Sequence, residues 1–404
     1  MSGDDFFDRE LELKALQSRV RDFNHVLLTG QRRMGKTSIT RELGRRVEAK
    51  GWGFVPADVQ GATCPEDVIA GIAEKAHPIR SIARRFATSM QRWMGDRIEE
   101  VSAYDFRVRI RSGLDAANWR RHGEHLLHDC AHHDKPVLLV IDELPIFLNR
   151  MLKEDGNALR VDEFLSWFRG VLQDLGDGSL VLIISGSIGL RPLVERLGIP
   201  DRINHLDSFR LGPWSRETSV ACFERLAESY ELQVEEGVAD AAYEALGLGI
   251  PQHVQSLFAR LRDFATMHGR DRIIVADVDE VYRNELLGPS GQNDLVHYET
   301  RLQEGMDDDT YRVSMEILAE AATQDVFTVN ARRSLERLYS ALVDDAPGRV
   351  SDALEVLIHD GYLEAGDDGH RFLSRLLKDW WSARFRDHHT PLLKRPSARP
   401  KWFR

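Results

Sequence analysis

Residues 30–37 have the types and spacing of a phosphate-binding loop, G-x-x-x-x-G-K-[ST]. In this pattern the glycines allow a tight turn, and backbone N–H groups at the start of the following helix point at phosphate oxygens. Lys36 is expected to reach the β- and γ-phosphates, and the Thr37 hydroxyl is expected to help hold Mg²⁺. The residues expected to contact the phosphates are Gly30, Gln31, Arg32, Arg33, Met34, Gly35, Lys36, Thr37 and Ser38.

A chance match in a glycine-containing turn is the alternative interpretation of this segment. The flanking residues disfavour it, because residues 25–29 have the composition of a short buried strand and residues 38–43 open a helix. A strand, this loop and a helix in that order predict a site for a nucleoside triphosphate.

Two adjacent acids, Asp142 and Glu143, follow a continuous apolar run over residues 136–141. Such a run is typical of a parallel strand buried on both faces, and a strand followed by two acids fits the Walker B pattern. Asp142 is expected in the Mg²⁺ coordination sphere, and Glu143 is expected to orient and polarise the attacking water. A solvated turn is the alternative, but the position about a hundred residues after a phosphate loop favours the catalytic interpretation. The presence of Glu143 predicts hydrolysis in addition to binding.

Further strands are expected over residues 52–58 and 180–185, with mostly helical sequence between residues 64 and 133. Strands that alternate with helices predict an α/β fold, a parallel sheet with ligands at the carboxyl ends of its strands. The last strand ends in Ser185-Gly186-Ser187, where a small hydroxyl could bond the γ-phosphate or the attacking water, the role called sensor 1. Ser187 is favoured over Ser185, and either could instead satisfy the backbone of a turn.

Composition agrees with a multi-domain, soluble, cytoplasmic protein. The chain has 404 residues, 42% of them hydrophobic and 29% charged, with no apolar run long enough to cross a membrane. The acidic first residues lack the plan of a secretory signal. Cys64, Cys130 and Cys222 are odd in number and widely spaced, which favours neither a disulfide framework nor a zinc site.

The net charge of −11 disfavours nucleic-acid binding over the whole surface but leaves room for a local basic patch. One patch is a helix face carrying Arg80, Arg84, Arg85 and Arg92, for which a solvated surface is the simpler interpretation. Another is the basic, proline-rich segment 386–404, which is expected to be solvated and poorly ordered.

The last third of the chain predicts a winged helix-turn-helix. Residues 311–322, 331–343 and 350–359 have helical apolar spacing, and residues 361–373 have the pattern of a hairpin. The third helix carries Asp352, Glu355 and Asp360, although a helix that enters a DNA groove should not be acidic. A protein-contact or self-inhibitory module is therefore favoured, while Arg332, Arg333 and Arg337 on the preceding helix keep DNA as the alternative.

These motifs together resemble the archaeal-type ATPases, AAA-like P-loop proteins that border on the STAND signal-transduction ATPases. The similar segments are residues 7–13, the arginine pair 32–33 and residues 141–145, 186–187, 211–215, 249–251, 360–363 and 376–381. The resemblance implies an ATPase core at residues 1–212, a helical lid at 213–300, a winged helix at 301–385 and the basic tail at 386–404.

The resemblance also implies roles for residues outside the loop. Arg9 would pack near the adenine, and Pro251, in the segment Gly249-Ile250-Pro251, would help place the lid over the nucleotide. No sensor-2 arginine follows Pro251, so hydrolysis would depend on an arginine from elsewhere. Arg202 stands where an arginine finger is expected; the alternative is a surface ion pair with Asp201 or Asp207.

The resulting functional hypothesis is an ATPase that uses ATP and Mg²⁺ as a molecular switch. It would control a partner protein or its own nucleotide-dependent homo-oligomerisation, without a membrane. The alternative is an ATP-dependent DNA-binding protein related in logic to replication initiators or transposition regulators. The choice of ATP over GTP depends on the resemblance, and no guanine-specifying N-K-x-D segment is present.

Overall fold

The computed structural model describes residues 6–90, 102–176, 179–186, 189–340 and 342–395. The chain divides into two compact units. The first comprises Met1–Thr29 and Lys36–Leu211, and the second comprises Gly30–Gly35 and Gly212–Arg404. The phosphate-binding motif is thus split, because its first six residues group with the second unit.

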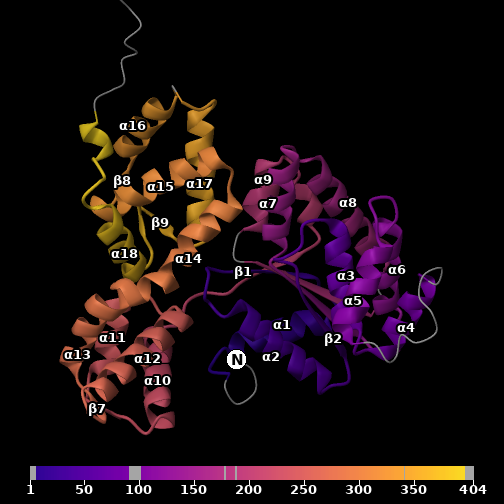
Figure 1. Ribbon diagram of the computed structural model, residues 1–404, viewed down its shortest axis with the longest axis horizontal. Helices are drawn as coiled ribbons and strands as arrows, with labels where there is room; N and C mark the ends of the chain where they lie inside the picture. The colour runs from indigo at the N-terminus through magenta and orange to yellow at the C-terminus, as the bar shows by residue number, and fades with distance from the viewer. Residues whose placement is uncertain (1–5, 91–101, 177–178, 187–188, 341, 396–404) are drawn as a thin grey trace, which may run out of the picture. The chain divides into compact units, whose positions relative to one another are not determined.

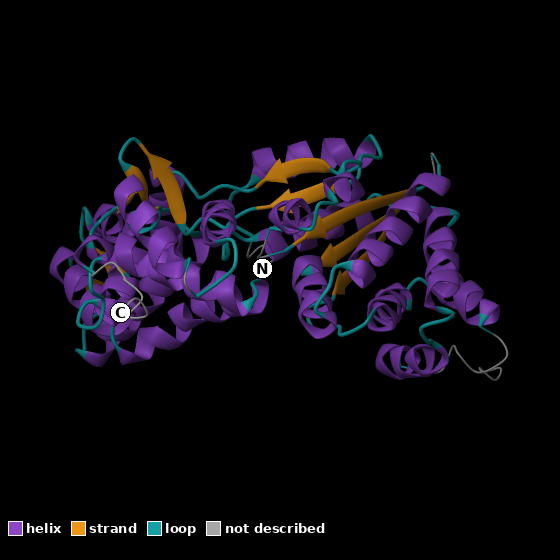
Figure 2. Ribbon diagram, turned by 90° about the horizontal axis from the view of Figure 1, so that it is seen from above, coloured by secondary structure: helices purple, strands orange, loops and turns teal. Residues whose placement is uncertain are grey.

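The first unit is built on a parallel sheet of five strands in the order β2-β3-β4-β1-β5. The strands are β1 (Val26–Thr29), β2 (Gly53–Asp58), β3 (Val137–Asp142), β4 (Leu180–Ser185) and β5 (Asp207–Arg210). Helices lie on both faces of this sheet (Figures 1 and 2). The predicted α/β fold is therefore confirmed, and the three strands that carry the motifs lie next to one another.

Two helices, α1 (Glu10–Arg21) and α2 (Lys36–Glu48), cover one face of the sheet. The remaining helices of the unit follow β2, β3 and β4 along the chain. They are α3 (Pro65–Ala76), α4 (Arg80–Ser89), α5 (Ala103–Gly113), α6 (Trp119–Ala131), α7 (Leu144–Asp155), α8 (Leu159–Asp174), α9 (Leu190–Arg196) and a 3-10 turn at Pro200–Ile203. The helical sequence expected between residues 64 and 133 is thus found in its described part.

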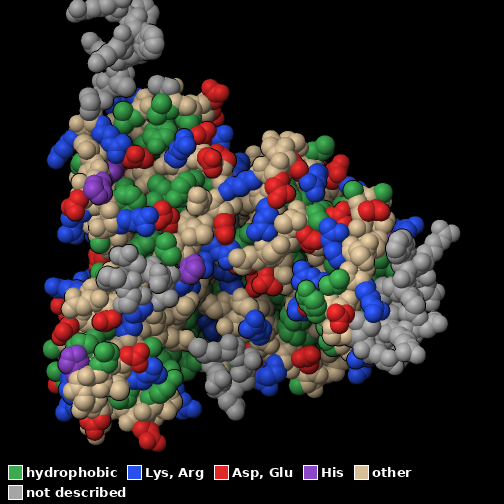
Figure 3. All heavy atoms as spheres, in the orientation of Figure 1, with side chains coloured by type: hydrophobic (Ala, Val, Ile, Leu, Met, Phe, Trp, Pro, Cys, Tyr) green, Lys and Arg blue, Asp and Glu red, His purple; other side chains and the backbone are tan. Residues whose placement is uncertain are grey.

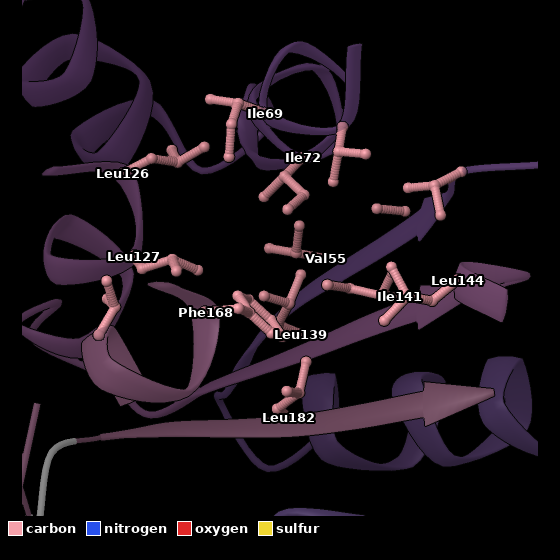
Figure 4. Packing of buried hydrophobic residues seen from close by; sticks show 14 of the residues in the cluster. Val55, Ile69, Ile72, Leu126, Leu127, Leu139, Ile141, Leu144, Phe168 and Leu182 are labelled. Carbon is pink, nitrogen blue, oxygen red and sulfur yellow. The ribbon is translucent and has the colours of Figure 1, made fainter. Parts of the chain in front are cut away.

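The core of this unit forms where alternate strand residues meet the covering helices (Figure 4). Val55, Leu139 and Leu182 point from three adjacent strands toward Ile69 and Ile72 of α3. From α6 and α8 come Leu126, Leu127 and Phe168. Burial of each such side chain contributes about 1.5–3 kcal/mol. Because both faces of the sheet are covered, β3 is apolar and buried up to Ile141, and only its last residue, Asp142, is incompletely buried.

The first half of the second unit is helical. It contains α10 (Arg216–Ser229), α11 (Val238–Leu246), α12 (Pro251–Met267), α13 (Val275–Val281), a π-helical turn at Tyr282–Leu286 and α14 (Pro289–Gly305). Two short parallel strands, β6 (Gln233–Val234) and β7 (Arg272–Ile273), pair within it.

The second half contains four helices and a small antiparallel sheet in the order β8-β10-β9. The elements are α15 (Asp308–Thr323), β8 (Phe327–Thr328), α16 (Val329–Tyr339), α17 (Ala346–His359), β9 (Leu363–Gly366), β10 (Gly369–Phe372) and α18 (Arg375–Phe385). They include the three helices and the hairpin expected from the sequence. They add a strand, β8, that the apolar pattern did not reveal because it has only two residues.

The segment after α18 differs from the expectation of a solvated, poorly ordered tail. His389 Nε2 lies 2.6 Å from a carboxylate oxygen of Glu320, and the same oxygen accepts the backbone N–H of Leu392 at 3.0 Å. Leu392 is fully buried within a short 3-10 turn, Leu392–Lys394, and Arg395 pairs with Glu316. The expectation is therefore wrong for residues 389–395, because buried polar and apolar contacts hold them on α15. Residues 396–404 lie outside the described part of the chain.

No helix in the described ranges is long and apolar enough to cross a bilayer.

Candidate active site

One carboxylate, that of Asp142, organises the carboxyl edge of the five-stranded sheet. Its Oδ2 accepts a hydrogen bond from the Thr37 hydroxyl at 2.7 Å, and its Oδ1 accepts one from the Ser185 hydroxyl at 2.6 Å. The backbone N–H of Glu143 also donates to Oδ1, at 3.1 Å. These residues meet because β3 and β4 are neighbouring parallel strands and α2 begins beyond the end of β1.

The two acids of the Walker B pattern occupy different backbone conformations. Asp142 ends β3, whereas Glu143 is the N-cap of α7 with φ 60° and ψ 29°, in the left-handed region. A non-glycine residue in that region costs about 1–2 kcal/mol, and such strain is found at functional sites. The turn thus gives the two adjacent acids, Asp142 and Glu143, different backbone conformations.

Lys36 is the first residue of α2, and its side chain is buried. The next residue, Thr37, is exposed. The start of this helix leaves backbone N–H groups without intrahelical partners, which together with the helix dipole favours an anion. Gly35 just before it has φ 88°, a value that suits glycine and that the tight turn requires. Ser38 lies within the first turn of α2.

The loop residues Gly30–Gly35 belong to the second unit, and their side chains contact other residues of that unit. The Gln31 amide donates to the Gly361 carbonyl at 2.6 Å, and Arg32 donates to the His297 carbonyl at 3.4 Å. The Arg33 guanidinium lies over the Tyr298 ring, 5.6 Å from its centroid. Met34 is buried, and Gly30 has φ 150°. The side chains of Gln31, Arg32 and Arg33 therefore contact protein groups in this structure.

Arg9 is buried at the N-cap of α1, where it pairs with Glu12 at 2.6 Å. The next residue, Glu10, bonds Arg46 of α2, and this hydrogen bond lowers the pKa of the Glu10 carboxyl. The segment predicted to pack near the adenine is thus tied to the helix that begins with Lys36. Pro251 is the first residue of α12, a position at which proline is favoured because it has no N–H to leave unpaired.

Arg202 lies in the 3-10 turn before β5 and is paired on both sides. Its Nε donates to Asp162 at 2.7 Å and its Nη1 to Asp201 at 2.5 Å. The pairing with Asp201 matches the alternative considered for this residue, and Asp162 takes the place suggested for Asp207. An arginine finger from Arg202 would first have to exchange these carboxylates for a phosphate.

The sequence favoured Ser187 over Ser185 as sensor 1, but it could not show which groups either hydroxyl contacts. Ser187 lies outside the described residues, whereas Ser185 is fully buried against Asp142. A further acid, Asp58, ends β2 and is paired in register with Asp142. The signal for Asp58 was present in the sequence, since it is an acid directly after a strand, but the neighbouring order of β2 and β3 could not be seen there.

The residues around Asp142 fit a magnesium ion. A carboxylate and a hydroxyl 2.7 Å apart are the oxygen donors that Mg²⁺ uses, with nucleotide phosphates and water for the rest of its shell. Within the ranges that the structure describes, no group of three or more His, Cys, Asp or Glu side chains could hold a metal ion without such help.

The described part of the chain thus has a parallel sheet of this order, with the G-x-x-x-x-G-K-T loop after β1 and an acid pair after β3, as in the P-loop fold. Residues 5–159 match the family model of the AAA ATPase domain. No curated protein sequence matches the chain. The domain match confirms the resemblance to AAA-like P-loop ATPases and the prediction of an ATP hydrolase. The structural comparisons confirm the α/β P-loop fold.

Two solved structures illustrate the similarity of fold. The Walker-type ATPase PaBY2304 of Pyrococcus abyssi is 19% identical, with a TM-score of 0.59 over 94% of this chain and 97% of that one. The Aeropyrum pernix ORC2 protein, solved in ADPNP–ADP complexes, is 14% identical, with a TM-score of 0.51 over 95% of this chain and 98% of that one.

Proposed function

We propose that this chain is a Mg²⁺-dependent ATPase that acts as a molecular switch. The observation that carries the proposal is the Asp142 carboxylate held by Thr37 and Ser185, which are neutral donors that leave its charge to attract a cation. The switch would act on a partner protein or on the assembly of the chain with itself. We also propose the domain limits 1–212, 213–300, 301–385 and 386–404, with a winged helix formed by α15, α16, α17 and the three-stranded sheet.

In this proposal the chain promotes in-line attack of water on the γ-phosphate. Lys36 and the N–H groups of loop and helix bind the phosphates, and Glu143 orients the water and takes up its proton. Thr37 and Asp142 would hold Mg²⁺, which when bound neutralises negative charge on the phosphates. Ser185 fixes the Asp142 carboxylate, and Arg202 or another arginine would stabilise charge in the transition state.

The switch part of the proposal is supported by contacts inside the second unit. Gln31 bonds the turn between α17 and β9, and Arg33 lies on Tyr298 of α14. A phosphate-binding segment held by these elements can pass a change in its own conformation to them. Such coupling is what a nucleotide-driven switch requires, because the ligand must interact differently with the two states.

The test combines size and turnover. Wild type and Glu143→Gln are compared by light scattering and phosphate release, each with ATP and Mg²⁺ and each with and without duplex DNA. The proposal predicts that Glu143→Gln forms an ATP-dependent assembly or a trapped complex, and that DNA changes neither size nor rate. Stimulation of wild-type turnover by DNA would replace the protein-switch proposal with the DNA-binding one.

A cavity beside α16 favours DNA binding as the second candidate. It has a volume of ≈270 Å³ and is lined by Phe327, Thr328, Val329, Arg332, Arg333, Glu336 and His370. Two guanidinium groups at such a cavity could bind phosphates, although Arg332 already bonds Glu336. On the face of the molecule in Figure 3, by contrast, basic and acidic side chains are interspersed.

The decisive measurement for this candidate is DNA affinity as a function of salt. A chain that neutralises several phosphates loses affinity steeply as salt rises, whereas a flat dependence would exclude the cavity as a DNA site. Arg333→Ala, compared with Arg225→Ala as an exposed control on α10, would assign the cavity.

A further inference from the structure

The first turn of α12 holds a buried histidine close to where the sequence analysis looked for an arginine. His253 is 2% exposed, and its Nε2 lies 3.0 Å from the Tyr298 hydroxyl. Burial, assisted by the positive charge of Arg33, lowers the pKa of His253 to about 3. The imidazole is therefore neutral at physiological pH and lies at hydrogen-bond distance from Tyr298.

Tyr298 connects that histidine to the loop segment. Its side chain is buried on α14, and its ring lies 5.6 Å from the Arg33 guanidinium, within the distance of a cation–π contact. Its backbone carbonyl accepts the Tyr362 hydroxyl at 2.8 Å, which fixes α14 against the strand-bearing end of the unit. Arg33 itself is in the left-handed conformation, with φ 68°, a conformation that needs support from its surroundings.

A second, separate contact fixes the same loop. Gly361 has φ +77° and its carbonyl accepts the Gln31 amide at 2.6 Å. A Cβ atom at Gly361 would lie 2.9 Å from Cγ and Cδ of Gln31, so only glycine allows this approach. Gly361 and Tyr298 thus contact the loop residues Gln31 and Arg33, and His253 and Tyr362 contact Tyr298. We name these four residues the loop clamp: His253, Tyr298, Gly361 and Tyr362.

We propose that Tyr298 is a positioning residue for nucleotide binding, which acts through Arg33. The contacts run from His253 on α12 through Tyr298 on α14 to Arg33 on the loop. Arg33 is on the loop and the ring that holds it is on α14. This inference rests on the proposed function, because it requires residues 30–37 to bind ATP.

A purely structural role for Tyr298 makes a different prediction. As a buried side chain it would affect stability, and its effect on ATP affinity would not depend on Arg33. A positioning role couples the two residues, and it needs the aromatic ring but not the hydroxyl. A double-mutant cycle with a conservative variant separates the two roles.

The experiment measures the Kd of ATP with Mg²⁺, by displacement of a fluorescent ATP analogue, for the full-length chain. The variants are Tyr298→Leu, Arg33→Met, the double variant and Tyr298→Phe. Tyr298→Leu and Arg33→Met are each expected to weaken binding about 3- to 30-fold, the factor that corresponds to one cation–π contact. The double variant is expected to be no weaker than Arg33→Met alone, and Tyr298→Phe to bind within about twofold of wild type.

Three results overturn the inference. In the first, Tyr298→Leu binds like wild type. In the second, Tyr298→Leu weakens ATP binding by the same factor in the wild-type chain and in the Arg33→Met variant. In the third, Tyr298→Phe binds as weakly as Tyr298→Leu. If Tyr298→Leu does not fold, by circular dichroism, Arg33→Met keeps the test open, because wild-type affinity in that variant contradicts the inference. A wild-type chain that binds no ATP would refute the proposed function itself, which distinguishes that failure from failure of the clamp alone.

Discussion

The carboxyl edge of the five-stranded sheet and the three-stranded sheet of the second unit both carry acids beside strand ends, but these acids have different partners. Asp142 accepts hydrogen bonds from two hydroxyls and one backbone N–H. Asp368, in the β9–β10 turn, pairs instead with Arg371 at 2.7 Å. A carboxylate fixed by neutral donors keeps its charge for a cation, whereas one paired with arginine is neutralised. The partners of an acid therefore indicate its role better than its position at a strand end does.

The largest effect that follows from this comparison is expected at Asp142. Asp142→Asn removes the charge but keeps the size, so it should lower ATP turnover about 10²- to 10³-fold, as loss of one preorganised electrostatic group does. Asp368→Asn is the matched control, because it removes only a surface ion pair. Steady-state phosphate release from both variants checks the difference, and equal rates in the two would invalidate the comparison.

The next effect concerns the hydroxyl that fixes Asp142. Ser185→Ala deletes a hydrogen bond to a charged group, and we expect turnover to fall about 10-fold or more while the fold is retained. Ser187→Ala tests the serine that the sequence alone favoured. A larger loss for Ser187→Ala than for Ser185→Ala would show that Ser185 is a structural residue and that the catalytic hydroxyl is elsewhere.

In the second unit the expected effects are on stability. Gly361→Ala places a Cβ atom against Gln31 at a left-handed position and should destabilise the chain by about 1–2 kcal/mol. Gly366→Ala, at the end of β9, meets only atoms at 3.6 Å and beyond and serves as the control. Thermal unfolding of both variants measures the difference; similar melting temperatures would mean that the Gly361 approach to Gln31 is dispensable.

The smallest effect is a pH dependence of stability that comes from Asp67. This carboxylate of the first unit has both a neutral partner, Thr63, and a charged one, Arg111. Burial raises the pKa of Asp67, but hydrogen bonds from Thr63 and Arg111 outweigh it and lower the pKa to about 2. Because the folded pKa lies below the usual value near 4, the contribution to stability is present above pH 4 and is lost as the pH falls toward 2.

Asp67→Asn should therefore destabilise the chain by about 1 kcal/mol or less at pH 7, since Arg111 is partly exposed. At pH 3, between the two pKa values, the difference from wild type should shrink. Denaturant unfolding at both pH values measures it, and a difference that is constant with pH would contradict the assignment of charge to Asp67.

Much of the first unit could be predicted from the sequence because its signals are local. The loop motif, the acid pair and the apolar runs of β3 and β4 each lie within one short segment, and all were found where expected. The strand order was not encoded locally, so the register of Asp58 with Asp142 and the contact of Ser185 with Asp142 became visible only in the structure.

The loop clamp shows why the rest could not be predicted. Gln31 and Gly361 are 330 positions apart, and neither residue type suggests the other as a partner. The same holds for the segment after α18, where the composition predicted a solvated tail but His389 and Leu392 find a buried partner in Glu320. Long-range contacts depend on how distant helices pack, and single-sequence patterns carry no information on that packing.

The central claim is that Asp142 and Glu143 belong to a site that hydrolyses ATP. The most direct test is single-turnover phosphate release from ATP with Mg²⁺, measured for wild type and Glu143→Gln with the nucleotide fully bound. We predict that Glu143→Gln binds ATP as tightly as wild type but releases phosphate at least about 100-fold more slowly, since binding is kept and the water-orienting base is lost. Equal rates of phosphate release in the two proteins would contradict the account.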